Sequence, residues 1–175
     1  MNITVYCGSN KGTDPAFEQE AVALGLWIAE NGHTLVYGGG NIGLMGILAD
    51  VVLDHGGAVI GVIPEFLIEH EHGHTGLHTL EVVPDMSTRK ARMLELGDVY
   101  IAMPGGPGTL EEISEAISHM RLLLHDCTCV FLNINGYYDL IHAAYRRMVE
   151  YGFMPEEQYD KILFVNTVKE IADRL

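Results

Sequence analysis

The chain has 175 residues, 48% of them hydrophobic, which is enough for one domain with a proper core and too few for two ordinary ones. Its formal net charge of -14 argues against a nucleic-acid polymer or an anionic membrane as a partner, since both are negatively charged themselves. The sequence has no apolar run of the roughly 18 residues that a membrane span needs. An anionic ligand must therefore be small and held by local positive features.

The N-terminal residues 1–7 lack the basic region and cleavage site of a signal peptide and run directly into a strand-like segment. The three cysteines, Cys7, Cys127 and Cys129, are an odd number in apolar contexts. This pattern is typical of buried thiols in a reducing compartment and predicts a cytoplasmic protein. Alternation along a strand puts Cys127 and Cys129 on one face, where packing explains them better than a metal pair does.

Short β-rich runs alternate with helical patterns along the whole chain. The predicted strands are residues 2–7, 34–37, 58–63, 78–83, 99–103, 127–132 and 162–164. The predicted helices are residues 15–30, 44–55, 87–96, 110–124, 137–150 and 168–175, where apolar residues recur at helical spacing. This alternation implies an α/β fold with a mainly parallel sheet of about seven strands and helices on both faces. We expect a single domain over residues 1–175, with ligands at the carboxyl ends of the strands.

The most informative stretch is residues 104–109 (PGGPGT), which follows an apolar run and opens a helical segment. Gly105, Gly106 and Gly108 let the backbone approach a ligand closely, because no Cβ stands in the way. The free N–H groups at the start of the following helix favour an anion, most often a phosphate. The sequence therefore predicts a phosphate site in this loop.

Two further glycine-rich loops are expected at the same edge of the sheet. The first predicted strand runs into Gly8 and Ser9, and the second into residues 38–46 (GGGNIGLMG), which include Gly39 and Gly40. The second loop formally matches the GxGxxG dinucleotide fingerprint, but it follows the second strand rather than the first. Any one loop alone could be a tight turn. Three on one edge indicate a compact ligand of mononucleotide size.

A cationic helix start lies between the second and third loops, in an otherwise acidic chain. Arg89, Lys90 and Arg92 are three of its ten basic residues and fall within four positions. For Lys90 and Arg92, a solvated helix face is an equally good interpretation. Arg89, in the first turns near the ligand edge, is the better candidate to pair with an anion or with Glu112.

Glu112 itself has two interpretations. Thr109 and Glu112 fit a capping box, in which Thr109 caps the helix and Glu112 reaches back to the backbone. The alternative is catalysis, because a carboxylate beside a phosphate repels it unless it points away or acts on a neighbouring part of the ligand. Spacing alone leaves both open.

Together these motifs resemble the LONELY GUY (LOG) family. They are residues 38–46, the Met86-x-x-Arg89-Lys90 motif and residues 104–112, and residues 7–9 and 135–139 fit as well, so the resemblance covers essentially the whole chain. Its members are cytokinin riboside 5′-monophosphate phosphoribohydrolases, long mislabelled as lysine decarboxylases. The resemblance implies a modified Rossmann fold, a homodimer or higher oligomer, and hydrolysis of the N-glycosidic bond of AMP or an N6-modified adenosine monophosphate to free base and ribose 5-phosphate.

By the same resemblance, Arg89 and Glu112 are the catalytic pair. The residues implied to hold phosphate and ribose are Gly8, Ser9, Gly39, Gly40, Met86, Lys90, Gly105, Gly106, Gly108 and Thr109. The chemistry is consistent, because N-glycoside cleavage passes through an oxocarbenium-like sugar that a carboxylate near C1′ can stabilise while it orients or deprotonates water. Arg89 would keep Glu112 ionised. No metal or redox cofactor is required.

Several features leave alternatives open. Pro107, the Ser87-Thr88 pair and residues 70–78 depart from the family pattern and bear on base specificity more than on the reaction. The four histidines of residues 70–78 could bind zinc or nickel, or could be incidental in a mobile loop near the mouth of the site, while His119 and His125 fit a helix surface. A non-catalytic carrier of a nucleotide or a molybdopterin-type cofactor is the alternative function, since fold does not fix function.

The helical segments 87–96 and 110–124 carry more apolar residues than one core-facing stripe needs. These residues are Met93, Leu94, Leu96, Ile113, Ile117, Met120, Leu122, Leu123 and Leu124. We therefore expect a twofold homodimer through these helices, with Arg92 or Arg121 crossing to the partner's site.

Overall fold

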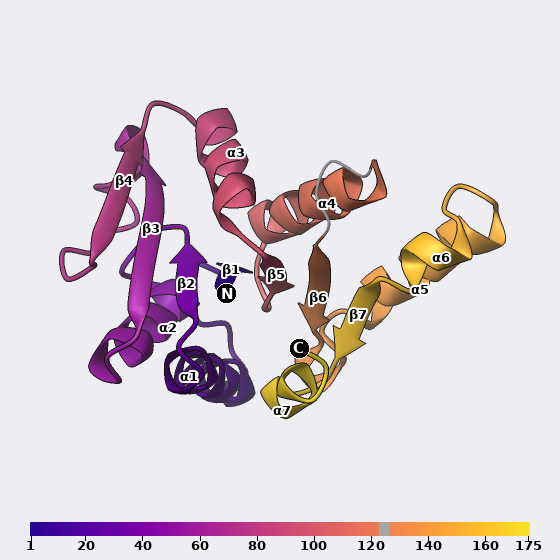
Figure 1. Ribbon diagram of the computed structural model, residues 1–175, viewed down its shortest axis with the longest axis horizontal. Coiled ribbons are helices and arrows are strands. Elements are labelled where there is room, and N and C mark those ends of the chain that lie inside the picture. Colours follow the sequence, from indigo (N-terminus) through magenta and orange to yellow (C-terminus); the bar gives the residue numbers. More distant parts are fainter. Residues whose placement is uncertain (123–126) are drawn as a thin grey trace.

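The structure is a computed structural model that describes residues 1–122 and 127–175. Within these residues, seven strands form one all-parallel sheet in the order β4-β3-β2-β1-β5-β6-β7 (Figure 1). The strands are β1 (Asn2–Tyr6), β2 (Thr34–Tyr37), β3 (Ala58–Pro64), β4 (Thr79–Val83), β5 (Val99–Ala102), β6 (Thr128–Leu132) and β7 (Ile162–Val165). The chain winds outward from β1 to β4 and then returns to pair β5 with the free side of β1. The strand order therefore reverses beside β1, which is where open α/β sheets bind their ligands.

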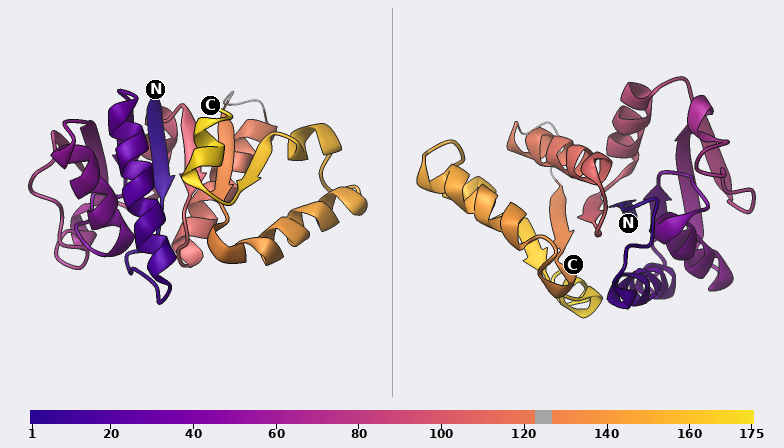
Figure 2. Two further views of the ribbon diagram at one scale, coloured as in Figure 1. Left: turned by 90° about the horizontal axis from the view of Figure 1, so that it is seen from below. Right: turned by 180° about the vertical axis from the view of Figure 1, so that it is seen from behind.

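Helices cover both faces of this sheet. They are α1 (Pro15–Glu30), α2 (Gly43–Asp54), α3 (Met86–Leu96), α4 (Pro107–Arg121), α5 (Asp139–Glu150), α6 (Glu156–Tyr159) and α7 (Val168–Ala172), with single 3₁₀ turns at η1 (Glu65–Leu67) and η2 (Ile134–Gly136). Helices α1, α2 and α7 pack on one face, and α3, α4 and α5 on the other (Figures 1 and 2). The central strands are consequently buried on both sides.

The side chains of β1 show how the sequence produces these two layers. Ile3 and Val5 point into the core under α1 and α2, whereas Tyr6 joins the core under α3 and α4. Successive side chains on a strand face opposite sides of the sheet, so a strand covered on both faces is apolar at every position. At the sheet edge this requirement relaxes, and Val82 of β4 is exposed.

The predicted α/β fold with a parallel seven-stranded sheet is confirmed, and most predicted elements agree with the observed ones within two or three residues. The largest difference at a functional position is in α4, which starts at Pro107 rather than at residue 110. Proline fits the first position of a helix, where its missing N–H would be unpaired anyway. Leu123 and Leu124, at the end of the predicted 110–124 helix, and the following His125 lie outside the described residues.

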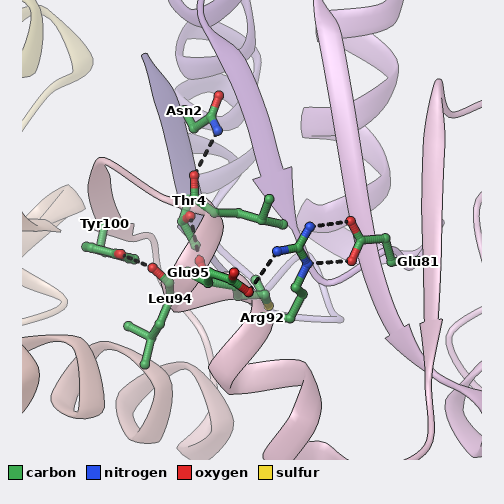
Figure 3. Close-up of polar contacts among 9 residues, drawn as sticks. Asn2, Thr4, Glu81, Arg92, Leu94, Glu95 and Tyr100 are labelled. Carbon is green, nitrogen blue, oxygen red and sulfur yellow. Dashed lines mark hydrogen bonds and ion pairs between the residues drawn. The ribbon is translucent and has the colours of Figure 1, made fainter. Parts of the chain in front are cut away.

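Helix α3 is held on the sheet by side chains that bond its C-terminal carbonyls. Asn2 Nδ2 donates to the Leu96 carbonyl at 2.8 Å, and the Tyr100 hydroxyl donates to the Leu94 carbonyl. Arg92 makes two bonds to Glu81 of β4, at 2.7 and 3.0 Å (Figure 3). These contacts fix α3 against β1, β4 and β5, and so fix the side chains that it presents to the carboxyl edge of the sheet.

Several residues that we expect at a dimer contact also make contacts within this chain. Met93, Leu94, Ile113, Ile117 and Met120 are buried in this chain's own core under α3 and α4. Packing inside this chain therefore accounts for these five residues, whereas Leu122 of the same set is exposed. Within this chain, Arg92 is bound to Glu81, and Arg121 donates to Gln158 and the Phe153 carbonyl.

Among the helices of the described ranges, none is long and apolar enough to cross a membrane.

Candidate functional site

A cavity of about 520 Å³ lies at the carboxyl edge of the sheet, beside the point where the strand order reverses. Its walls come from the loops after β1, β2 and β5, from one face of α3, from the start of α4, from the β3–β4 connection and from α1. The volume suits a small organic ligand such as a mononucleotide. The cavity lies where the sequence predicts a ligand, at the carboxyl ends of the strands.

The loop after β1 joins the other loops through its backbone. The Gly8 N–H donates to the Pro104 carbonyl at 3.1 Å, and the Leu44 N–H donates to the Gly8 carbonyl at 3.2 Å. Gly43 has φ +61°, and a Cβ at this position would lie 2.3 Å from the Ser9 carbonyl carbon. Glycine is therefore required at Gly43 both by conformation and by the close approach of the two loops.

The start of α4 shows that Thr109 and Glu112 do not form a capping box. Gly106 is the N-cap, makes no side-chain cap bond, and is followed by Pro107 at the first helical position. Thr109 is buried inside the first turn, with its hydroxyl so close to Gly105 that a Cβ there would lie 2.1 Å from Oγ1. The capping interpretation of Glu112 is thus wrong. The first N–H groups of α4 have no partner within the helix and are available to an anion.

Arg89 is a buried residue of α3 that crosses the cavity floor to β2 and β3. Its Nε donates to the Val62 carbonyl at 3.1 Å, and its Nη2 donates to the Gly38 carbonyl at 3.0 Å. A Cβ on Gly38 would lie 2.1 Å from Nη2, so only glycine leaves space for the guanidinium. Its ion-pair partner is Glu71, with 3.8 Å between Nη2 and Oε2, rather than Glu112 as the sequence suggested.

The carboxyl group of Glu112 lines the same cavity. Burial raises its pKa from the ordinary 4.5 to about 7, and the negative charges of Glu71 and Glu111 act in the same direction. Arg89 and Lys90 lower this pKa, but they do not outweigh the burial. Arg89 thus acts in the expected direction, toward the ionised form of Glu112, but burial has the larger effect on this pKa.

Most of the predicted site residues line this one cavity. They are Gly8, Ser9, Met86, Arg89, Gly105, Gly106, Gly108, Thr109 and Glu112. Met86, Arg89 and Met93 are spaced three and four residues apart on α3 and share the face that meets the cavity.

Three predicted residues lie elsewhere. Lys90 is on the side of α3 that faces α4, where its Nζ is 2.7 Å from Glu111 and 3.0 Å from Glu115. Gly39 and Gly40 are buried behind the cavity wall and bind the β3–β4 connection. The His74 N–H donates to the Gly39 carbonyl at 2.9 Å, and Gly40 forms a bridge with Gly73.

Sequence reasoning missed three lining residues with distinctive chemistry. Phe17 and Tyr137 pack edge to face with 5.6 Å between ring centroids, and the Tyr137 hydroxyl donates to the Gly105 carbonyl at 2.6 Å. Tyr137 could have been found, because it lies in the 135–139 motif. Phe17 and the acidic Glu71 belong to no motif, so no local signal pointed to them.

Two histidines of the histidine-rich segment bond other parts of the chain. The buried His74 accepts the Gly76 N–H on Nδ1 at 3.0 Å, so its Nε2 donates to Asp50, also at 3.0 Å. His70 Nδ1 bonds the Phe66 carbonyl. In the described residues, no three His, Cys, Asp or Glu side chains come together as metal ligands would.

The fold and this cavity define the chain as a Rossmann-like α/β protein with a glycine-lined pocket at the switch point of its sheet. The sequence model of the family described as "Possible lysine decarboxylase" matches residues 45–175. A cytokinin riboside 5′-monophosphate phosphoribohydrolase of Rhodococcoides fascians is 42% identical over 169 residues, covering 96% of this chain and 85% of that one. One of Arabidopsis thaliana is 40% identical over 173 residues, with 99% and 80% covered. The chain therefore belongs to the LOG family of cytokinin riboside 5′-monophosphate phosphoribohydrolases.

Solved structures support the fold. A molybdenum cofactor binding protein from Rippkaea orientalis superimposes with a TM-score of 0.72 at 20% identity, covering 98% of this chain and 93% of that one. The Moco carrier protein of Chlamydomonas rheinhardtii superimposes with a TM-score of 0.73 at 20% identity, covering 98% of this chain and 93% of that one. At this identity the likeness concerns the architecture alone.

Proposed function

We propose that this chain hydrolyses the N-glycosidic bond of nucleoside 5′-monophosphates, such as AMP or N6-modified adenosine monophosphates, to the free base and ribose 5-phosphate. The observation that carries the proposal is the Glu112 carboxyl group, partly buried in the same cavity as the free N-terminus of α4. The curated relatives that are named for this reaction match over nearly the whole chain.

The phosphate would bind at the start of α4. The backbone N–H groups of Gly108 and Thr109 point out of the first turn, and the helix dipole favours a negative charge there. Gly105 and Gly106 keep side chains out of the way of the phosphate oxygens. The Thr109 hydroxyl, packed against Gly105, is a further donor at this position.

Glu112 would act at the anomeric carbon. It follows Thr109 by three residues, and therefore lies about 4.5 Å farther along the helix axis and on the same face. A ribose bound through its 5′-phosphate at the helix start would bring C1′ to this carboxylate. The ionised form stabilises positive charge on the oxocarbenium-like sugar and orients or deprotonates the attacking water.

Arg89 would organise this region of the site. Its bonds to the Val62 and Gly38 carbonyls hold the guanidinium in place, and its positive charge favours the ionised form of Glu112. In this role Arg89 positions the ribose end of the cavity and offsets the two carboxylates that line it.

Two other activities fit the cavity less well. A carrier of a phosphorylated cofactor would gain nothing from a buried carboxylate at the sugar, since that group costs stability in the free protein. A pyridoxal-dependent decarboxylase needs a lysine to bind its cofactor covalently. Among the described lining residues the single lysine is Lys11, which is exposed and paired with Glu18.

The test is incubation with AMP, adenosine and ATP, with free base and ribose 5-phosphate separated by chromatography. We expect AMP to be hydrolysed and both adenosine and ATP to be poor substrates, because the loops and the helix dipole suit one terminal phosphate. Equal turnover of adenosine would contradict the proposal, since phosphate recognition would then contribute nothing.

We further propose that residues 1–175 form a single cytoplasmic domain that assembles as a homodimer. The structural support for the dimer is an exposed apolar group at the end of α4 and after α5. Leu122, Tyr151 and Phe153 are 68%, 67% and 77% exposed, and Arg121 links the two segments through its bond to the Phe153 carbonyl. Exposed apolar groups of this kind mark association surfaces.

A further inference from the structure

Glu71 carries a carboxylate oxygen that is buried in the cavity wall without a hydrogen-bond donor. The side chain lines the cavity, is only 18% exposed, and its Oε2 atom has no hydrogen-bond partner. The nearest cation is Arg89, with 3.8 Å between Nη2 and Oε2, which is beyond hydrogen-bond distance. The protein therefore satisfies the Glu71 carboxylate incompletely, while the partly exposed side chain remains in contact with the cavity.

Backbone hydrogen bonds on both sides of Glu71 fix its position in the cavity wall. The Glu71 N–H donates to the Leu67 carbonyl at 2.8 Å, and the Asn41 N–H donates to the Glu71 carbonyl at 2.9 Å. A Cβ on Gly40 would lie 3.2 Å from the Glu71 Cβ. The buried glycines after β2 therefore serve to bring the β3–β4 connection, and with it this carboxylate, against the cavity.

No described residue donates a hydrogen bond to Oε2. The Arg89 Nε–H and one of the two Nη2 N–H groups bond the Val62 and Gly38 carbonyls, and in this position Nη2 stays 3.8 Å from Oε2, too far for its second proton to make a hydrogen bond. Burial raises the pKa of Glu71 above its ordinary value, while Arg89 acts in the opposite direction. An unfilled buried acceptor is destabilising, and a ligand that supplies the donor recovers that free energy on binding.

The proposed substrate has one group that matches. Its phosphate offers only acceptors and would be repelled by Glu71, whereas the ribose presents hydroxyl donors. With phosphate at the start of α4 and C1′ at Glu112, the sugar spans the region between Thr109 and Arg89, which Glu71 faces. Of the ribose hydroxyls, the 2′-hydroxyl is adjacent to C1′, and bonds to this hydroxyl strengthen as a glycoside approaches its transition state.

We propose that Glu71 accepts a hydrogen bond from the 2′-hydroxyl of the ribose and makes the site selective for ribonucleotides over 2′-deoxyribonucleotides. This inference rests on the proposed function, because it places the sugar by the phosphate and Glu112. Glu71 is then a substrate-binding residue, supplied by the segment between β3 and β4.

Kinetics of Glu71→Gln and Glu71→Ala on two substrates test the proposal. For AMP we expect Glu71→Ala to lower kcat/KM by about 10- to 100-fold, the range for a hydrogen bond to a charged group, with a smaller loss for Glu71→Gln, which keeps an acceptor oxygen. For 2′-deoxy-AMP, which lacks the donor, both variants should behave nearly as the wild type. Equal losses on both substrates, or no loss on AMP, would overturn the inference.

Glu69→Ala is the matched control, because Glu69 is an exposed glutamate two residues away on the same segment. It should leave the ratio of the two substrates unchanged. Calorimetric binding of ribose 5-phosphate and 2-deoxyribose 5-phosphate gives a second readout that needs no turnover. If the wild type hydrolyses no nucleotide, the proposed function fails, while loss of the preference for ribose 5-phosphate in Glu71→Ala would still support the role of Glu71. An unchanged preference would reject it.

Discussion

Replacing Glu112 with glutamine separates its chemical role from its structural one. The substitution keeps the shape of the side chain and removes the negative charge. If the carboxylate stabilises the oxocarbenium-like sugar or activates water, turnover of AMP should fall by about 10²–10⁴-fold while AMP binding survives.

The same substitution has a predictable effect on stability. Burial raises the pKa of Glu112 from 4.5 to about 7, and a shift of this size corresponds to about 3 kcal/mol. For an acid whose pKa is raised on folding, the folded state binds the proton more tightly. The contribution of Glu112 to the free energy of unfolding is therefore most favourable below the unfolded pKa of 4.5, and it is lost as the pH rises from 4.5 toward the folded pKa of about 7. Glutamine resembles the protonated form, so Glu112→Gln should be more stable than wild type at pH 8, by at most about 3 kcal/mol, and equally stable at pH 4.

The assay combines initial rates of ribose 5-phosphate release with thermal unfolding at both pH values. Glu111→Gln is the control, because Glu111 is the exposed neighbour and pairs with Lys90 outside the cavity. The wild-type kcat/KM should rise with pH through about 7 as Glu112 ionises. The pH profile of Glu112→Gln should lack this rise. The second ionisation of the substrate phosphate near pH 6 should remain in both. Near-normal turnover by Glu112→Gln would refute the hydrolytic role and favour the carrier function.

Three further predictions follow from the contacts of the site and the exposed surface. Arg89→Ala should abolish activity and lower the free energy of unfolding by about 1–3 kcal/mol for each carbonyl left unpaired, at Val62 and Gly38. Denaturant unfolding measures this loss, and an unchanged stability would contradict a structural role for the two Arg89 bonds. Gly38→Ala should reproduce much of that loss, because its Cβ would lie 2.1 Å from the Arg89 Nη2, and a crystal structure with an unmoved guanidinium would count against this explanation. Light scattering at micromolar concentration should give twice the 19.3 kDa chain mass, and Phe153→Glu should shift the protein toward monomer; a wild-type monomer would reject the homodimer.

The layers and strands of the fold could be predicted because both are local properties of the sequence. Strands such as Ala58–Pro64 are apolar on both faces, and alternation with helices of suitable length leaves few topologies. The sequence pattern predicts the start of α4 three residues late, at residue 110, because glycines and proline are typical of loops. The signal for the true start was present, since Pro107 is suited to the first helical position.

The site was predictable only as far as its residues followed strand ends and helix faces. Gly8, Gly105 and Arg89 could be placed in this way. Lys90 is one residue from Arg89, yet it faces α4, and only the packing of α3 decides between the two sides. Glu71 is buried by a contact between the glycines after β2 and the β3–β4 connection, and a contact between segments leaves no pattern along either one.

The backbone bonds of Gly8 have a consequence for the motions of the cavity. Through its N–H and carbonyl, Gly8 joins the loop after β1 both to Pro104 and to Leu44, and Tyr137 adds the segment after β6 by its bond to Gly105. None of these segments can move away from the cavity without breaking a bond to its neighbour, so they form one cooperative unit of local unfolding. The amide protons of Gly8 and Leu44 should then exchange with solvent at similar rates. A ligand that touches only the α4 end should slow both, so that occupancy of one end is reported at the other.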